Sequence, residues 1–109
     1  MRIRYTKASR KDVEEIFEYV APRSDDSVAD HLLEAITATC EFLADYPNLG
    51  RHRPELDDNG VEIRSIAERG YLILYTYRED QIYIVRIMHG AMDIDKSDLW
   101  PLSEITQQN

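Results

Sequence analysis

The sequence predicts an α+β fold with an N-terminal strand and an antiparallel helical hairpin packed on one face of a three- to four-stranded antiparallel sheet. Two amphipathic segments separated by a short linker lie before residue 46, which is typical of a helical hairpin. Apolar runs after residue 60 are joined by turns too short for crossover helices, so consecutive strands are expected to pair antiparallel. A chain of 109 residues has the size of one domain.

The first two expected elements are a strand and a helix. Residues 2–6 alternate polar and apolar side chains, which predicts a short strand that adds to an edge of the sheet. Ser9, three residues before Asp12, is a candidate N-cap for the first helix. The helix is expected to end before Pro22, because the residue that precedes a proline avoids the helical region. Its apolar face consists of Val13, Ile16, Phe17 and Val20.

The second helix is expected from about Asp26 to Asp45. Residues 24–27 offer an N-cap, and Pro47 and Gly50 mark the end of the helix. The short linker makes the two helices antiparallel neighbours. The main apolar stripe of the second helix consists of Val28, Leu32, Ala35, Ile36, Thr39 and Leu43, widened by Leu33, Cys40 and Phe42.

Three strands are expected after a polar loop at residues 51–60. Residues 61–66 alternate as in a half-exposed strand, and two apolar runs on either side of residues 78–81 predict a β-hairpin. Alternation along the first hairpin strand separates two faces. The face with Leu72, Leu74 and Thr76 is expected to pack on the helices, which leaves the face with Tyr71, Ile73, Tyr75 and Tyr77 partly exposed.

Two interpretations remain open for the tyrosine-lined face. Exposed aromatic side chains favour a protein partner, because a tyrosine ring can be buried while its hydroxyl stays in water. Alternatively, the C-terminal segment with Leu99 and Trp100 folds back over this face.

Composition and charge limit the function classes. The chain has 21 acidic residues against 13 lysines and arginines, a formal net charge of −8. Proteins that grip phosphate backbones usually present a basic surface, so no direct sequence-specific nucleic-acid binding is expected. No apolar run approaches the ~20 residues of a membrane span, and no signal peptide is evident at the start. Cys40 is the single cysteine and is expected to be a reduced core residue of a cytoplasmic protein.

Candidate site residues are mostly cationic. The three histidines lack the spacing of metal ligands and no glycine-rich phosphate loop is present, so neither metal nor cofactor is expected. Arg51, Arg53, Arg64 and Arg86 form a candidate basic patch that could bind an anion. In the alternative interpretation, Arg86 pairs with an acidic side chain at the sheet edge, since a charge on an apolar face needs a partner. His89 is either a hydrogen-bonded residue at a strand end or a general base.

Four segments, taken together with the element order, carry a family resemblance. They are residues 42–51 (FLADYPNLGR), 64–66 (RSI), 71–75 (YLILY) and 85–90 (VRIMHG). The combination closely resembles the ParE toxins of the RelE/ParE superfamily of type II toxin–antitoxin systems, often described as plasmid stabilisation proteins. It covers about residues 2–93, which implies a single toxin domain over 1–95 and an acidic C-terminal tail over 96–109. The last residues, 106–109, are expected to be disordered.

The superfamily implies two different activities. RelE-like members are ribosome-dependent mRNA endonucleases, whereas ParE-like members inhibit DNA gyrase and are not known to be enzymes. RNA cleavage needs a base, an acid and cations that stabilise the transition state. Here no lysine occurs between Lys11 and Lys96, and no tyrosine follows Tyr83. The sparse acid/base set and the acidic balance favour the ParE-like activity, for which no catalytic residue is expected.

The alternative activity has a defined candidate site. A RelE-like RNase would use Arg64, Arg86 and His89. A second alternative is a non-toxic module that only titrates an antitoxin. ParE-like chains also often carry an arginine just before the aspartate that follows His-Gly, where this chain has Met92 before Asp93.

The resemblance also implies partners. A ParD-like antitoxin would neutralise the toxin by laying a helix and then an extended strand along the helical hairpin and the sheet, and the free toxin could form a homodimer. Tyr75→Asp would then weaken antitoxin binding and leave the fold intact. The expected antitoxin-binding residues are Val13, Phe17, Leu32, Ile36, Tyr71, Tyr75 and Tyr77.

Overall fold

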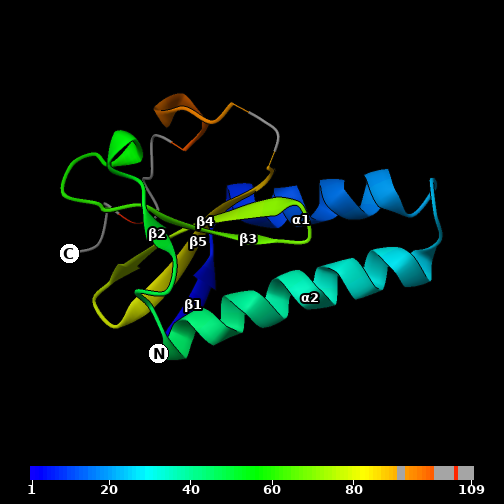
Figure 1. The fold of residues 1–109 in the computed structure, drawn as a ribbon, viewed down its shortest axis with the longest axis horizontal. Coiled ribbons are helices and arrows are strands. Elements are labelled where there is room, and N and C mark those ends of the chain that lie inside the picture. The colour runs from blue at the N-terminus through cyan, green and yellow to red at the C-terminus, as the bar shows by residue number, and fades with distance from the viewer. Residues whose placement is uncertain (91–92, 100–104, 106–109) are drawn as a thin grey trace.

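Two helices pack against one sheet in the computed structural model, which describes residues 1–90, 93–99 and 105 (Figure 1). The strands are β1 (Arg2–Tyr5), β2 (Arg51–His52), β3 (Arg64–Glu68), β4 (Tyr71–Arg78) and β5 (Gln81–His89). The helices are α1 (Lys7–Val20) and α2 (Asp26–Asp45), with short 3-10 turns at Pro54–Leu56 and Lys96–Asp98. This architecture confirms the expected α+β class.

The sheet is mixed and has five strands in the order β1-β5-β4-β3-β2. β1 runs parallel to β5, and the other neighbouring pairs are antiparallel. The structure differs from the expected three- to four-stranded antiparallel sheet in the number of strands and in the parallel pairing of β1. Turn lengths determine only how consecutive strands pair, and β1 is separated from β5 by most of the chain. The prediction that the first strand adds to an edge of the sheet is confirmed.

Side-chain caps determine where the helices begin. Thr6, not Ser9, is the N-cap of α1, and its side chain accepts a hydrogen bond from Ser9 N at 3.1 Å. The expectation that Ser9 caps this helix is wrong, because Ser9 lies within the first turn and its hydroxyl donates to Thr6 O. For α2, Asp25 accepts from Val28 N at 2.9 Å, and the expected limits of this helix are confirmed.

The β4–β5 hairpin has a two-residue turn formed by Glu79 and Asp80, with φ values of 53° and 60°. Two successive left-handed residues are typical of a type I′ turn, whose twist matches that of the flanking strands. The predicted hairpin is confirmed, although the assignment of its faces is reversed. Tyr71, Ile73 and Tyr75 point toward the helices, and Leu72 and Leu74 lie on the opposite face.

The face toward the helices carries one of the two buried clusters of the core. We call its residues the helix-side cluster. It consists of Ile16, Ile36, Cys40, Leu43, Ile73, Tyr75, Ile82, Ile84 and Ile87. Burial raises the pKa of the Cys40 thiol to about 11, so this side chain is a protonated core residue, as expected.

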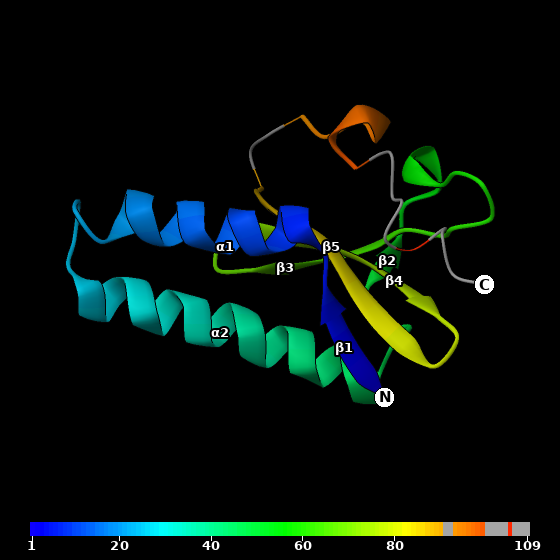
Figure 2. The same cartoon turned by 180° about the vertical axis from the view of Figure 1, so that it is seen from behind.

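The opposite face is covered by the chain itself. The loop between β2 and β3 and the C-terminal segment pack there, and Figure 2 shows both on the side of the sheet away from α2. Leu99 thus covers the leucine face, not the tyrosine face, while Trp100, Met92 and residues 106–109 lie outside the described residues. We call this the loop-side cluster. It consists of Leu56, Val61, Ile63, Leu74, Tyr83, Val85, Met88, Leu99 and Ile105.

A β-bulge divides β5 into two halves. Ile84 pairs with Tyr75 and Arg86 pairs with Leu74, which leaves Val85 as an extra residue on β5. β1 pairs with β5 only as far as Ile84. The bulge therefore lies where β5 loses its neighbouring strand on that side.

Helix α1 supplies the missing hydrogen bonds beyond that point. Thr6 Oγ1 donates to Val85 O at 2.8 Å, and Asp12 Oδ2 accepts from Ile87 N at 2.9 Å. Buried backbone groups need such partners, because an unpaired group is costly away from water. Side chains of α1 and of its N-cap thus complete the edge of β5 where β1 ends.

Asp12 also binds the side chain of Arg86. Arg86 Nε and Nη2 donate to the two carboxylate oxygens of Asp12, each at 2.8 Å, and Nη1 donates to Asp98 O at 2.6 Å. The Asp12 side chain is 7% exposed and that of Arg86 is 23% exposed. The hydrogen bonds to Asp12 raise the pKa of Arg86 above the ordinary value of an arginine. Of the two interpretations of Arg86, the pairing with an acidic side chain is the one observed.

Tyr75 joins the sheet to the segment that follows α2. Its hydroxyl donates to Pro47 O and accepts from Gly50 N, both at 2.8 Å, and the residue is fully buried. A Cβ atom at Gly50 would lie 2.6 Å from the Tyr75 ring, so only glycine fits there. Burial raises the pKa of Tyr75. The expected exposure of this side chain to a partner is therefore wrong.

Replacing Asp12 by alanine should destabilise the fold strongly. The change leaves the guanidinium of Arg86 without its carboxylate and the N–H of Ile87 without an acceptor. Loss of one member of a largely buried pair should lower the free energy of unfolding by about 3 kcal/mol. Urea denaturation followed by circular dichroism measures this. Lys11→Ala, which removes an exposed pair with Glu15, is the control and should stay close to the unchanged chain. Equal midpoints for both variants would contradict the role of Asp12.

Tyr75→Phe should lower the free energy of unfolding by about 2 kcal/mol, because it leaves the buried N–H of Gly50 and the partly buried carbonyl of Pro47 without a partner. The matched control is Tyr77→Phe on the same strand, where the residue is 45% exposed. Thermal unfolding of the two variants compares them directly. Tyr75→Asp should unfold the chain, since it places a carboxylate in the helix-side cluster. A folded Tyr75→Asp variant would overturn this assignment.

Candidate partner-binding surfaces

Three of the four candidate arginines gather at the β2 end of the sheet. Arg51 pairs with Ser65 across the β2–β3 ladder and is exposed. Arg53 Nε donates to Glu55 at 2.8 Å, and Arg64 Nη1 donates to Gly50 O at 2.7 Å. These bonds hold Arg53 and Arg64 against the chain, which leaves Arg51 as the arginine of this group that extends into solvent.

Arg86 is not part of that group. It lies on β5, which β4 separates from β3, so two strand spacings of about 5 Å each lie between the strands. Its guanidinium is held by Asp12 and by Asp98 O. The structure therefore does not unite the four arginines in one anion-binding cluster.

The three candidate RNase residues do not converge either. Arg64 lies opposite Tyr75 on β4, whereas His89 lies opposite Tyr71, four residues away or about 13 Å along the strand. His89 contacts the Tyr71 ring edge to face, with 5.6 Å between ring centroids. A pocket of about 440 Å³ is lined by Tyr19, Tyr71 and His89, without either arginine. His89 occupies a strand end, and no described cleft brings a base and two cations together.

The expected antitoxin-binding residues differ in accessibility. Val13, Phe17, Leu32 and Tyr71 are half-buried and Tyr77 is exposed, so a partner can reach part of each. Ile36 and Tyr75 are fully buried in the helix-side cluster and offer no surface. Ile36 faces the sheet because the stripe that contains it is the core face of α2.

Two aromatic side chains at the C-terminal end of α2, Phe42 in its last turn and Tyr46 at its C-cap, were not singled out as partner-binding by the sequence pattern. Phe42 and Tyr46 stack with 4.8 Å between ring centroids, and they are 51% and 55% exposed. Their spacing of four residues places them on one side of the helix. That spacing is the sequence signal that could have identified them, although the stripe pattern placed Phe42 with the core.

The side of α2 that carries Thr39 lies next to an open edge of the sheet. β2 pairs only with Arg64 and Ser65, so residues 66–68 of β3 have no described strand on their outer side. Thr39 Oγ1 donates to Glu68 Oε1 at 2.7 Å, which holds this side of α2 next to β3. Phe42 follows Thr39 at i+3 and shares its side of the helix. We call this combination of residues 66–68 with Phe42 and Tyr46 the β3 surface.

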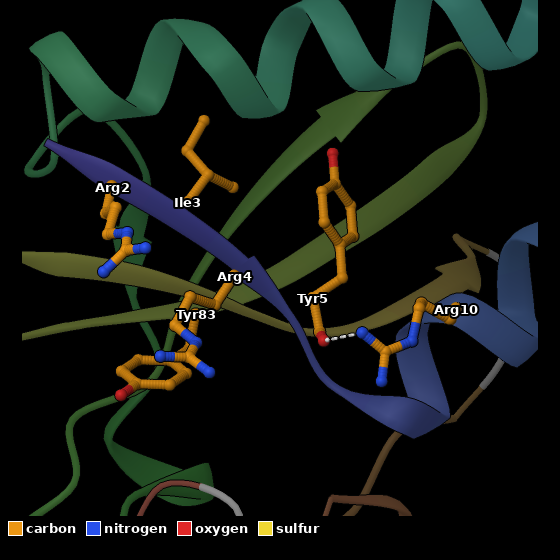
Figure 3. Close-up of a pocket in the computed structure, with 6 residues that line it drawn as sticks. All are labelled: Arg2, Ile3, Arg4, Tyr5, Arg10 and Tyr83. Carbon is orange, nitrogen blue, oxygen red and sulfur yellow. Dashed lines mark hydrogen bonds between the residues drawn. The ribbon is translucent and has the colours of Figure 1, made fainter.

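The opposite edge of the sheet has a pocket with different chemistry. Its volume is about 620 Å³, and three of the side chains that line it are arginines (Figure 3). The lining residues are Arg2, Ile3, Arg4, Tyr5, Arg10 and Tyr83.

The part of the chain that the structure describes also bears on membrane insertion and metal binding. Neither helix in that part of the chain combines the length and the apolar character that crossing a bilayer requires. Over the same residues, no group of three or more histidine, cysteine, aspartate or glutamate side chains is arranged to hold a metal ion.

Comparisons with known proteins agree with the fold. The family model described as the ParE toxin of type II toxin-antitoxin systems, parDE, matches residues 3–94. Toxin ParE3 of Caulobacter vibrioides is 26% identical over 93 residues, which is 85% of this chain and 90% of that protein. A solved structure, the chromosomal ParDE TA system from P. aeruginosa, is similar in fold, with a TM-score of 0.66 and 19% identity over 82% of this chain and 95% of that one. The family model spans most of the chain, and the protein therefore belongs to the ParE toxins of type II toxin–antitoxin systems.

Proposed function

We propose that this toxin inhibits DNA gyrase, and so blocks replication, by binding the enzyme and not by catalysis. The observation that carries the proposal is the dispersal of Arg64, Arg86 and His89 within a ParE-type chain. An RNase that uses the 2′-hydroxyl as nucleophile needs its base and its cations around one phosphate. Arg86 is instead engaged by Asp12 and His89 lies far from Arg64 along the sheet.

The net charge of −8 also favours gyrase inhibition over ribosome-dependent RNA cleavage. Contact with ribosomal RNA favours a basic surface, whereas a protein target such as gyrase does not demand one. The action would take place in the cytoplasm, which suits the single buried thiol of Cys40.

The test is a supercoiling assay with purified gyrase, run in parallel with a translation assay that detects mRNA cleavage. We expect the toxin to block supercoiling and to leave translated mRNA intact. His89→Ala should inhibit gyrase as the unchanged chain does, because His89 has no part in the proposed action. Cleavage of mRNA that depends on His89, with supercoiling unaffected, would establish the RNase alternative. Absence of both effects, with normal growth on expression, would favour the non-toxic module.

We also propose that a ParD-like antitoxin binds the helical hairpin and the β3 surface. The hairpin offers the half-buried Val13, Phe17 and Leu32 to an amphipathic helix. The β3 surface offers open backbone groups at residues 66–68 to an extended strand. Phe42 and Tyr46 are large, exposed aromatic side chains of the kind that dominates binding energy in interfaces. Without antitoxin, the same apolar surface could support a homodimer.

The double variant Phe42→Ala with Tyr46→Ala should weaken antitoxin binding by about 2 kcal/mol or more, because truncated aromatic anchors commonly have effects of this size. Titration calorimetry against the cognate antitoxin measures the change. Glu62→Ala is the control, since Glu62 is exposed in the loop that covers the opposite face of the sheet. A dissociation constant that the double variant leaves unchanged would remove the β3 surface from the antitoxin interface.

A further inference from the structure

Positive charge is concentrated at the start of the chain. Residues 1–11 contain five of the 13 lysines and arginines and none of the 21 acidic residues. Arg2, Arg4 and Arg10 line the pocket beside β1. Among the described residues, no carboxylate lies within ion-pair distance of Arg2 or Arg4. A strongly acidic protein thus keeps Arg2 and Arg4 without a neighbouring carboxylate, among the described residues, at one edge of its sheet.

The backbone of β1 is available at the same edge. Thr6 N donates to Ile84 O at 3.1 Å, and successive residues of a strand direct their polar groups to opposite sides. Ile3 and Tyr5 therefore direct their backbone N–H and C=O groups away from β5. The bond from Arg10 Nη1 to Tyr5 O, at 3.0 Å, agrees with this direction. The N–H groups of both residues and the carbonyl of Ile3 are left for an added strand.

The side chains of β1 divide between two faces, as Figure 3 shows. Ile3 and Tyr5 point toward α2 and belong to the helix-side core. Arg2 and Arg4 point to the other side, where the ring of Tyr83 lies. A strand added here would therefore meet arginines on one face at every second position.

We propose that this edge, the β1 edge, binds an acidic, extended peptide segment of a partner protein. The segment would pair with the outward backbone groups of β1 and direct alternate carboxylates toward Arg2 and Arg4. Arginine suits this role, because its planar fork matches a carboxylate with two parallel hydrogen bonds. The site lies across the sheet from the β3 surface, and the inference does not depend on inhibition of gyrase or on the place where the antitoxin binds.

Charge complementarity selects this occupant over two others. A second copy of the chain would bring its own Arg2 and Arg4 against the same arginines, so the charges oppose self-pairing at this edge. A nucleic acid would satisfy the guanidinium groups but not the outward N–H groups and carbonyl of an open strand. An acidic peptide satisfies both sets.

The test uses the full chain and a synthetic peptide of alternating glutamate and valine, with an alternating glutamine and valine peptide as the neutral probe. We expect the acidic peptide to bind about tenfold more tightly than the neutral one, given two arginine–carboxylate contacts at a solvent-exposed site. The double variant Arg2→Gln with Arg4→Gln should remove this preference. Arg23→Gln, at the exposed turn after α1, should retain it. Hydrogen exchange followed by NMR should show slower exchange at the amides of Ile3 and Tyr5 when the acidic peptide is bound.

Three results would overturn the proposal. Equal affinity for the two peptides, or an acidic preference that the double variant retains, would show that the arginines do not select the ligand. Unchanged exchange at Ile3 and Tyr5 would show that no strand is added. Tight binding of a single-stranded DNA oligonucleotide that the double variant abolishes, without peptide binding, would assign the pocket to nucleic acid. Because both probes are also compared on the unchanged chain, the test does not depend on the variant folding.

Discussion

The Asp12 carboxylate is the point at which the helices and the sheet are joined. It accepts a hydrogen bond from the backbone of Ile87 and two from the side chain of Arg86. One short side chain thus supplies a hydrogen-bond acceptor at the edge of β5 and neutralises a cation near the core. The bulge at Val85 and the end of β1 at Tyr5 both lie next to this contact. α1 could not lie along the second half of β5 without it, because the strand would keep unpaired backbone groups.

Once α1 is fixed there, both faces of the sheet are covered by this chain. The helices cover one face, and the loop between β2 and β3 together with Leu99 and Ile105 covers the other. The apolar character of both faces of the hairpin thus needs no partner protein to explain it. Surfaces for partners remain at the two edges of the sheet and on the outer side of the helices.

Local patterns predicted the elements well and their assembly less well. The limits of α2 and the β4–β5 hairpin follow from a cap, a proline and a tight turn, all of which act within a few residues. The face of β4 that meets the helices could not be predicted from the sequence, because the alternation of side chains does not distinguish two faces that are both apolar. The parallel pairing of β1 with β5 and the Asp12–Arg86 contact join residues more than 70 positions apart. The type of partner for Arg86 was predictable from its charge, but its identity was not.

The two open edges of the sheet differ in chemistry, and this difference bears on how partners can combine. The β3 surface offers aromatic rings, and the β1 edge offers arginines. Three strand spacings of about 5 Å separate β1 from β3, so two separate segments can occupy the edges together. The helical hairpin lies across the face between them. At about 1.5 Å per residue, a helix of about ten residues laid on that hairpin would span this distance and could link an apolar segment at one edge with an acidic segment at the other. Binding at both edges by one chain would add avidity to two individually modest contacts.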